Sequence, residues 1–170
     1  MEKEGMMQSF WRGSTVGVVL ALGVLLGADI VTLSAQASDP RIGTWKLNVA
    51  KSKYSPGPPP QSLTVRVESS GKGEKVTAEF VNADGTRTTT EYTANFDGKD
   101  YPITGSRIAN TVSLKRVDAR TTVRTDKKDG KVAQTLRRVV SRDGKTMTVT
   151  VKGKNAQGQA VNNVVVFEKQ

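Results

Sequence analysis

Residues 141–151 read SRDGKTMTVTV. An apolar side chain stands at every second position from Met147 to Val151, with threonines between them. A period of two indicates a β-strand that buries one face. The Asp143-Gly144 pair ahead of the run supplies the positive φ angles that a two-residue hairpin turn requires. The segment therefore predicts a strand that follows a tight hairpin.

The same combination recurs along the chain. Further Asp-Gly pairs stand at residues 84–85, 97–98 and 129–130, between alternating runs rich in β-branched residues. Alternating runs lie at residues 63–67, 76–80, 88–96 and 112–114 as well. We expect an all-β fold of about eight to ten antiparallel strands in an up-and-down meander. Closure into a barrel would remove the exposed edges, and a two-sheet β-sandwich is the alternative.

The N-terminal region has the layout of a secretory signal. Arg12 precedes the apolar run Thr15–Ala28, and the A-x-A pattern at residues 35–37 follows it. We expect cleavage after Ala37, which leaves residues 38–170 as a single domain that is periplasmic or extracellular. The alternative is an N-terminal membrane anchor, but the run is shorter than the ~20 apolar residues of a spanning helix. No stable membrane span is expected after cleavage.

The composition excludes several kinds of chemistry. The 170 residues include no Cys and no His, so disulfides, thiolate or imidazole metal sites and His-dependent triads are absent. Asp residues gather at turns, where turn chemistry explains them. We therefore expect no catalytic residues, no metal and no cofactor, and a protein that is not an enzyme.

The formal net charge of +10 is concentrated in one part of the chain. Lys99–Lys154 holds 15 basic and 5 acidic residues, a net charge of +10. One interpretation is a solvated outer face of several strands. The other is a surface for an anionic envelope polymer. Nucleic acid is disfavoured as a partner by export and by the few aromatic residues available for stacking.

A family resemblance rests on motifs at both ends of the domain. Gly43-Thr44-Trp45 is a Gly-x-Trp motif in the first strand, and the chain ends with a hairpin at Asp143–Lys145 and a final strand through Val166–Lys169. This arrangement resembles the lipocalins and fatty-acid-binding proteins, the calycin group, and most of all small secreted bacterial lipocalin-like proteins.

The resemblance implies a structural role for two residues. Gly43 and Trp45 would belong to the barrel floor, where the Trp45 ring would pack beneath Arg137 or Arg138. The chain also departs from the family. A Pro-rich loop, Lys51–Ser62, stands where fatty-acid-binding proteins have a helical lid, and Val165-Val166-Phe167 stands where they often have an Arg-x-Tyr carboxylate anchor. Because of these two departures, the resemblance does not imply fatty-acid binding for this chain.

Strand parity suggests a ligand site inside the barrel. Arg138 shares a face with Leu136 and Val140, and Arg116 shares one with Val112 and Leu114. If these faces point inward, both arginines enter the barrel.

A buried arginine requires an anion or several acceptors. The two arginines would hold a ligand carboxylate or phosphate, with Tyr92 and Phe96 lining the wall. The alternative places Arg116 and Arg138 at strand ends, in contact with solvent. The sequence thus favours a non-enzymatic binding protein for a small amphipathic or anionic hydrophobic ligand. The second candidate is an adhesive envelope protein with a basic outer face.

Overall fold

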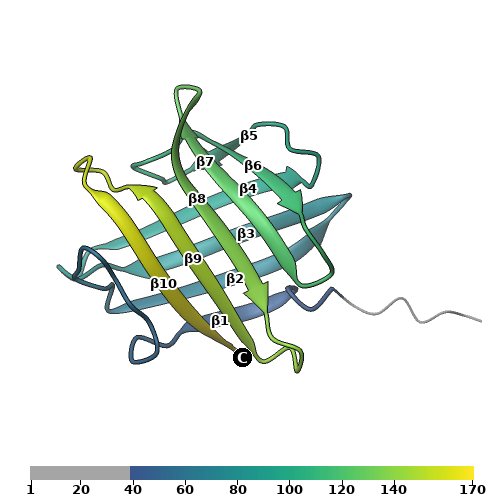
Figure 1. The fold of residues 1–170 in the computed structure, drawn as a ribbon, viewed down its shortest axis with the longest axis horizontal. Coiled ribbons are helices and arrows are strands. Elements are labelled where there is room, and N and C mark those ends of the chain that lie inside the picture. The colour runs from purple at the N-terminus through teal and green to yellow at the C-terminus, as the bar shows by residue number, and fades with distance from the viewer. Residues whose placement is uncertain (1–38) are drawn as a thin grey trace, which may run out of the picture. The chain divides into compact units, whose positions relative to one another are not determined.

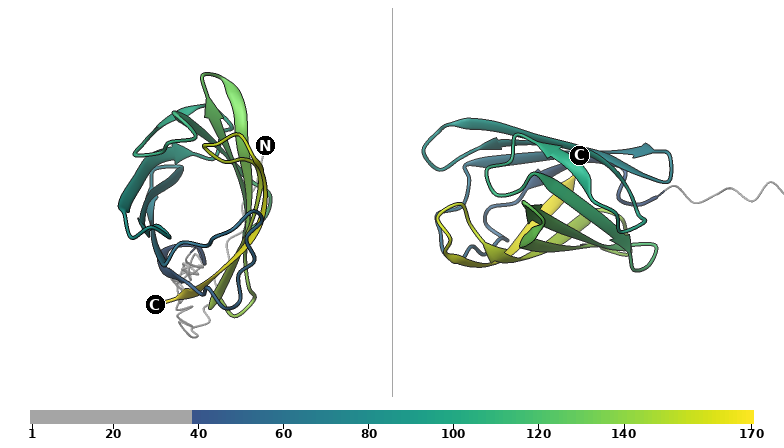
Figure 2. Two further views of the ribbon diagram at one scale, coloured as in Figure 1. Left: turned by 90° about the vertical axis from the view of Figure 1, so that its left-hand side faces the viewer. Right: turned by 90° about the horizontal axis from the view of Figure 1, so that it is seen from above.

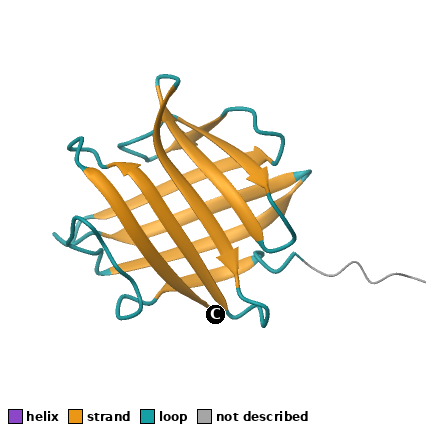
Figure 3. Cartoon of the chain, viewed as in Figure 1, coloured by secondary structure: helices purple, strands orange, loops and turns teal. Residues whose placement is uncertain are grey.

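The computed structural model describes residues 39–170 (Figure 1). The expected signal peptide, residues 1–37, and Ser38 lie outside the described residues. Within the described part, strands and loops make up the fold and no helix occurs (Figure 3). The ten strands are β1 (Gly43–Leu47), β2 (Ser62–Ser70), β3 (Gly73–Val81), β4 (Arg87–Asn95), β5 (Tyr101–Thr104), β6 (Thr111–Arg116), β7 (Thr121–Lys128), β8 (Lys131–Val140), β9 (Thr146–Lys154) and β10 (Ala160–Lys169).

The strands close into one antiparallel barrel. Each strand pairs with its neighbours in sequence, and β1 pairs with β10 to complete the ring. In Figure 1, β7 to β10 lie in front and cross the direction of β1 to β4 behind them. The predicted meander and its closure are confirmed, and the sandwich alternative is wrong. Closure leaves no long unpaired edge between the first and last strands.

The turns differ in length from the prediction. All four Asp-Gly pairs place Gly at positive φ. Only Asp129-Gly130 forms a two-residue hairpin, and there Asp129 also has a positive φ of 49°. The other three pairs lie in five-residue connections. In each of these the Asp carboxylate accepts a hydrogen bond, 3.0 Å long, from the backbone N–H two residues later. In these three turns the Asp therefore stabilises the turn through its side-chain hydrogen bond, and its own backbone keeps an ordinary negative φ.

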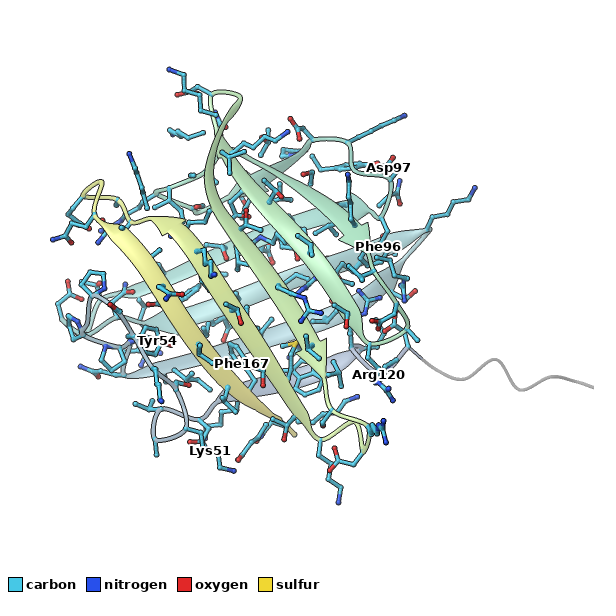
Figure 4. All side chains as sticks on the ribbon, viewed as in Figure 1. Lys51, Tyr54, Phe96, Asp97, Arg120 and Phe167 are labelled. Carbon is cyan, nitrogen blue, oxygen red and sulfur yellow. The ribbon has the colours of Figure 1, made fainter. Side chains whose placement is uncertain are left out.

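The barrel has two different ends. The connections after the odd-numbered strands gather at one end, and those after the even-numbered strands gather at the other. Tyr54, between β1 and β2, marks the first end, whereas Phe96 and Arg120 mark the second (Figure 4). We call the first the mouth and the second the floor. The Pro-rich segment predicted as a loop over Lys51–Ser62 is a loop as far as Gln61 and lies at the mouth, whereas Ser62 already belongs to β2.

Strand parity places the predicted faces correctly. Leu136 and Arg138 face inward on β8, whereas Arg137 between them is exposed. Glu79 and Glu91 lie on the outer surface. Among residues 39–170 no helix has the length and apolar character needed to cross a membrane.

Candidate functional site

A cavity of about 670 Å³ occupies the barrel interior. Its wall is mostly apolar, with Leu63 on β2, Phe80 on β3 and Val149 on β9 among the lining side chains. The mouth is lined by Tyr54, with Pro58 and Pro60 of the β1–β2 loop, and by the turns after β3, β5 and β9. The void is large enough for a small organic molecule. Figure 2 shows the strands arranged around this interior.

Glu74 lies at the centre of a charged cluster beneath the cavity. It is 1% exposed, and its Oε1 accepts hydrogen bonds from Arg138 Nη2 at 2.6 Å and from Tyr92 Oη at 2.8 Å. Arg138 Nε donates to Thr122 Oγ1 at 3.0 Å, and its Nη1 lies 3.4 Å from Tyr92 Oη. The buried arginine thus has several protein acceptors. Arg138 and Tyr92 still line the cavity, so their remaining surface faces its interior.

Arg41 closes the barrel from below. It is 2% exposed, its Nη1 lies 3.3 Å from Glu74 Oε2, and its guanidinium also pairs with Asp39. Its backbone carbonyl accepts a hydrogen bond of 2.8 Å from Nε1 of Trp45, which is completely buried. The segment before β1 is therefore held across the floor by two interactions, the ion pair between Arg41 and Glu74 and the hydrogen bond from the Trp45 indole to the Arg41 carbonyl.

Two predicted ligand residues belong to this closure instead of the cavity. The Phe96 ring has Arg41 and Arg116 against it, each with its guanidinium carbon 4.5 Å from the ring centroid. Arg116 also pairs with Asp39 at 2.9 Å and is 39% exposed. Neither Phe96 nor Arg116 is among the cavity-lining residues. Arg116 stands at the end of β6, as the alternative interpretation expected, whereas Arg138 enters the barrel.

The predicted partner of Trp45 is wrong. Arg138 is engaged with Glu74, and Arg137 points outward. The cation at Trp45 is Lys169 on β10, whose Nζ lies 5.2 Å from the ring centroid. The reason is the closure of the barrel, because β1 pairs directly with β10 and Trp45 is opposite Lys169. Gly43 lies against the same lysine, since a Cβ there would be 2.8 Å from its Cε.

Arg124 and Asp126 form a second ion pair, on the cavity wall. Arg124 Nε and Nη2 donate to the two Asp126 oxygens at 2.5 and 2.7 Å. The Arg124 guanidinium carbon lies 4.9 Å from the Tyr92 ring centroid. Asp126 does not use its Nη1, and the side chain lines the cavity. A ligand anion could therefore bind there without breaking the pair with Asp126.

Three groups of the cavity wall and floor have pKa values that differ from their ordinary ones. Burial raises the pKa of Tyr92 to about 12, so its hydroxyl stays protonated and donates to Glu74. Burial works to lower the pKa of Arg124, but Asp126 and Tyr92 outweigh it and the net direction is upward. Partial burial acts to raise the pKa of Asp39, but the hydrogen bonds from Arg41 and Arg116 outweigh it and lower that pKa to about 2.

Sequence reasoning missed Glu74, Arg124, Asp126 and Arg41. The parity signal for Glu74 was present, because it stands two residues before Val76 on the inward face of β3. On β7 the same rule would have pointed the wrong way, because Val123, the one apolar residue of the strand, has the opposite parity to the inward-facing Arg124 and Asp126. Arg41 precedes the first strand and carried no periodic signal. In residues 39–170 no group of three or more acidic, His or Cys side chains could hold a metal ion.

Comparisons with known proteins gave one structural similarity. No protein-family model matches the chain, and the search of curated proteins gave no match. Among solved structures, the barrel is similar to zebrafish ileal bile acid-binding protein, which was solved in complex with cholic acid. The two share 14% identity and a TM-score of 0.45, over 77% of this chain and 99% of that one. The nature of a ligand for this chain therefore has to be argued from its own cavity.

Proposed function

We propose that this protein is an exported, lipocalin-like, non-enzymatic binding protein for a small amphipathic molecule with an anionic group. The supporting observation is the cavity of about 670 Å³ with apolar side chains on its wall and two arginines near its floor. This volume is within the roughly 300–1,000 Å³ range of small-molecule sites. Apolar surface supplies the affinity and a few polar groups fix the orientation.

Arg124 and Arg138 are the residues proposed to receive the anionic group. Each is already paired with one carboxylate, which removes most of the cost of burying it. Each retains N–H groups beyond those its carboxylate partner uses, and both side chains line the cavity. Tyr92 lies between them in contact, since it stacks on Arg124 and meets Arg138 through its hydroxyl. Arg116 and Phe96 are not part of this proposed binding site, because they contribute to closing the floor.

A displacement assay tests the binding function. A hydrophobic fluorophore should bind with increased emission, and laurate should displace it at lower concentration than dodecanol, which has the same chain without the charge. Binding inside the barrel should change little between low and high salt, because buried contacts are weakly screened. Absence of fluorophore binding, or equal competition by the acid and the alcohol, would contradict the proposal.

A double variant and a matched control test the role of Arg124 in ligand binding. Arg124→Gln with Asp126→Asn removes the ion pair without leaving a buried carboxylate alone. We expect this double variant to lose about tenfold in laurate affinity, as for one charge-assisted hydrogen bond, and to keep its affinity for dodecanol. Arg137→Gln removes an arginine of neighbouring β8 that points outward, and it should leave both affinities unchanged.

Export is a separate part of the proposal. It is supported by the sequence of residues 12–37, which lie outside the described structure. Mass spectrometry of the protein recovered from the host's envelope or medium should show an N-terminus at Ser38. An intact N-terminal segment on the exported protein would contradict cleavage.

A second candidate is adhesion to an anionic envelope polymer. It is supported by the exposed cations of Lys99–Lys154, among them Lys115, Arg137 and Lys152 on three different strands. Retention on an anionic matrix that falls steeply with salt would favour this function. Laurate would not affect that retention, whereas the cavity function predicts laurate binding without a strong salt dependence.

A further inference from the structure

The outer surface of the barrel differs in charge from one side to the other. On β2, β3 and β4 the charged side chains that point away from the cavity are of both signs, namely Arg66, Glu68, Lys75, Glu79, Arg87 and Glu91. The outward positions of β6, β7, β8 and β9 carry cations and no acid, namely Lys115, Lys127, Arg137, Lys152 and Lys154. Strands β7 to β9 lie at the front of the barrel in Figure 1. This side of the barrel is therefore positively charged.

The acids of Lys99–Lys154 do not offset these outward cations. Asp126 faces the cavity. The other acids lie in connections between strands, namely Asp100, Asp118, Asp129 and Asp143. Asp100 pairs with Lys127 at 2.7 Å, which leaves four outward cations. These four are exposed and form no ion pair with any of residues 39–170.

We call these four cations the basic face, namely Lys115, Arg137, Lys152 and Lys154. The strand register places them along one diagonal line. Lys115 and Arg137 are both opposite Val123 of β7, so their Cα atoms lie two strand spacings apart, or about 10 Å. Lys152 is diagonal to Arg137 across the β8–β9 pair, at about 7–8 Å, and Lys154 lies two residues farther along β9. The basic face thus presents successive cations at intervals of about 7–10 Å.

Protection of strand edges does not explain this surface. Cations on an exposed edge strand prevent pairing with another chain. In the closed barrel, however, each of β6 to β9 is paired on both sides. Solubility does not require a single sign either, because mixed charges such as those of β2 to β4 provide it. Charges of one sign repel one another, and an anionic partner would remove that repulsion. The basic face is therefore complementary to a partner with negative charges along a line.

The neighbouring side chains favour an acidic polysaccharide as that partner. Most other outward positions of β6 to β9 carry hydroxyl groups that can hydrogen-bond to sugars, among them Ser113, Thr125, Thr135 and Thr150. No outward position on these strands is aromatic, so nucleobases find no stacking surface. A flat bilayer fits the curved wall poorly, and the one large apolar side chain exposed on these strands is Val132.

We infer that the basic face binds a linear acidic polysaccharide, a chain with carboxylates on successive sugars, along the outside of the barrel. This inference rests on the second candidate function and assigns it to a particular surface. None of the four cations lines the cavity. On β8, Arg137 points outward while the adjacent Arg138 points inward. Polymer binding and cavity binding are therefore two separate activities of one protein.

Neutralising the basic face tests the assignment. The variant replaces three of its cations by glutamine, as Lys115→Gln, Arg137→Gln and Lys152→Gln. Biolayer interferometry measures the affinity for immobilised polygalacturonate, a linear polymer with one carboxylate per sugar, at about 0.1 M salt. We expect wild-type binding to weaken steeply as salt is raised. The triple variant should lose about tenfold in affinity, or a little over twofold for each exposed ion pair.

The matched control removes the same number of charges from β2, β3 and β4, by Arg66→Gln, Lys75→Gln and Arg87→Gln. Its net charge equals that of the first variant, but we expect its affinity to stay within about twofold of wild type, because salt screens charges on a distant wall. Both variants alter exposed side chains and should unfold at the wild-type urea concentration. Equal losses of affinity in the two variants would overturn the inference, because overall charge would then govern binding.

Further measurements separate this partner from others and this surface from the cavity. Tighter wild-type binding to phosphatidylglycerol vesicles or to DNA than to polygalacturonate would overturn the choice of partner. Saturating polygalacturonate should leave the affinity for the hydrophobic fluorophore unchanged, and a loss of fluorophore binding would overturn the separation of the two activities.

The outcomes also distinguish this inference from the proposed functions. If both triple variants bind polygalacturonate as the wild type does, adhesion stands and the assignment to the basic face fails. If the wild type does not bind the polymer, the second candidate function fails together with this inference. If the fluorophore does not bind, the cavity function fails, and the two triple variants still decide the inference.

Discussion

Glu74 connects the floor of the cavity to the segment that closes the barrel. Its carboxylate is buried between Arg138 and Arg41, so it is the shared counter-charge of two guanidinium groups. Removing one partner of a buried ion pair leaves a charge that neither water nor protein compensates.

We expect Glu74→Gln to lower the free energy of unfolding by about 3–5 kcal/mol, because the isosteric amide leaves both arginines without their shared carboxylate. Glu79→Gln, on the exposed face of the same strand, should change it by no more than about 0.5 kcal/mol. Urea unfolding at neutral pH measures both. Similar losses in the two variants would show that the buried cluster does not stabilise the floor.

Asp39 should make the stability of the floor depend on pH. Its pKa is about 2 in the folded protein, below its ordinary value of 3.8. A depressed folded pKa contributes stability above the unfolded pKa, and this contribution is lost as the pH falls from about 4 toward 2. Asp39 is partly exposed, so we expect Asp39→Asn to cost about 1–2 kcal/mol at neutral pH.

The pH profile of that variant distinguishes the cause. The difference between wild type and Asp39→Asn should stay constant from pH 7 to pH 5 and shrink as the pH falls below 4. Urea titrations at several pH values give both curves. A difference that persists unchanged at pH 3 and below would assign the loss to packing instead of charge.

The sequence predicted individual residues where strand parity applied. Arg138 and Tyr92 are inside the barrel, as parity indicated, and Glu74 follows the same rule although it was not proposed. Parity cannot tell how far along the barrel axis a side chain lies. Arg116 has the right face but stands at the strand end, so it meets Asp39 and Phe96 instead of the cavity.

At the scale of the strands, β8 and β9 approach each other closely at Gly153. A Cβ at this position would lie 2.1 Å from the carbonyl oxygen of Ala133, and the backbone has a φ of +144°. Gly158, in the turn after β9, also has a positive φ, of +78°, but a Cβ there would have no neighbouring atom within 4 Å. Alanine substitutions at the two glycines therefore distinguish the free-energy cost of a steric contact from that of a strained backbone conformation.

We expect Gly153→Ala to destabilise the protein by more than about 2 kcal/mol, since both contact and φ oppose a side chain. Gly158→Ala should cost about 1 kcal/mol, from the backbone alone. Thermal and urea unfolding of the two variants provide the comparison. Equal losses of stability in the two variants would contradict the contact argument, because β8 would then have moved away from the new methyl group at no cost in free energy.

The strands themselves were the most predictable elements. A period of two survives in the sequence because each strand has one face toward the interior and one toward water. The lengths of the connections were less predictable, because an Asp-Gly pair fits a two-residue hairpin at residues 129–130 and a five-residue connection at residues 143–144. The partner of Trp45 depended on which strands close the ring, and pairing between the first and last strands leaves no local pattern.

At the scale of the whole molecule, ligand binding and folding should be coupled. A ligand that binds only the closed barrel stabilises it by an amount set by its concentration relative to its Kd. We expect laurate at a hundred times its Kd to raise the free energy of unfolding by about 2.7 kcal/mol. Chemical unfolding with and without laurate measures this change.

The Arg124→Gln/Asp126→Asn variant provides the control for that experiment. At the same laurate concentration, a tenfold weaker affinity should reduce the stabilisation to about 1.4 kcal/mol. A stabilisation that is identical in wild type and variant would place the bound laurate away from Arg124.

Arg41, Trp45 and Phe96 seal one end of the barrel, so the interior is a cup and not a tunnel. A second ligand molecule has no other entrance, so the bound ligand has to dissociate through the mouth before another can bind. The rate at which a bound molecule departs should therefore be the same however much competitor is added. The part of the ligand that passes Tyr54 first is also the part that reaches Arg138, so its orientation is decided on the way in.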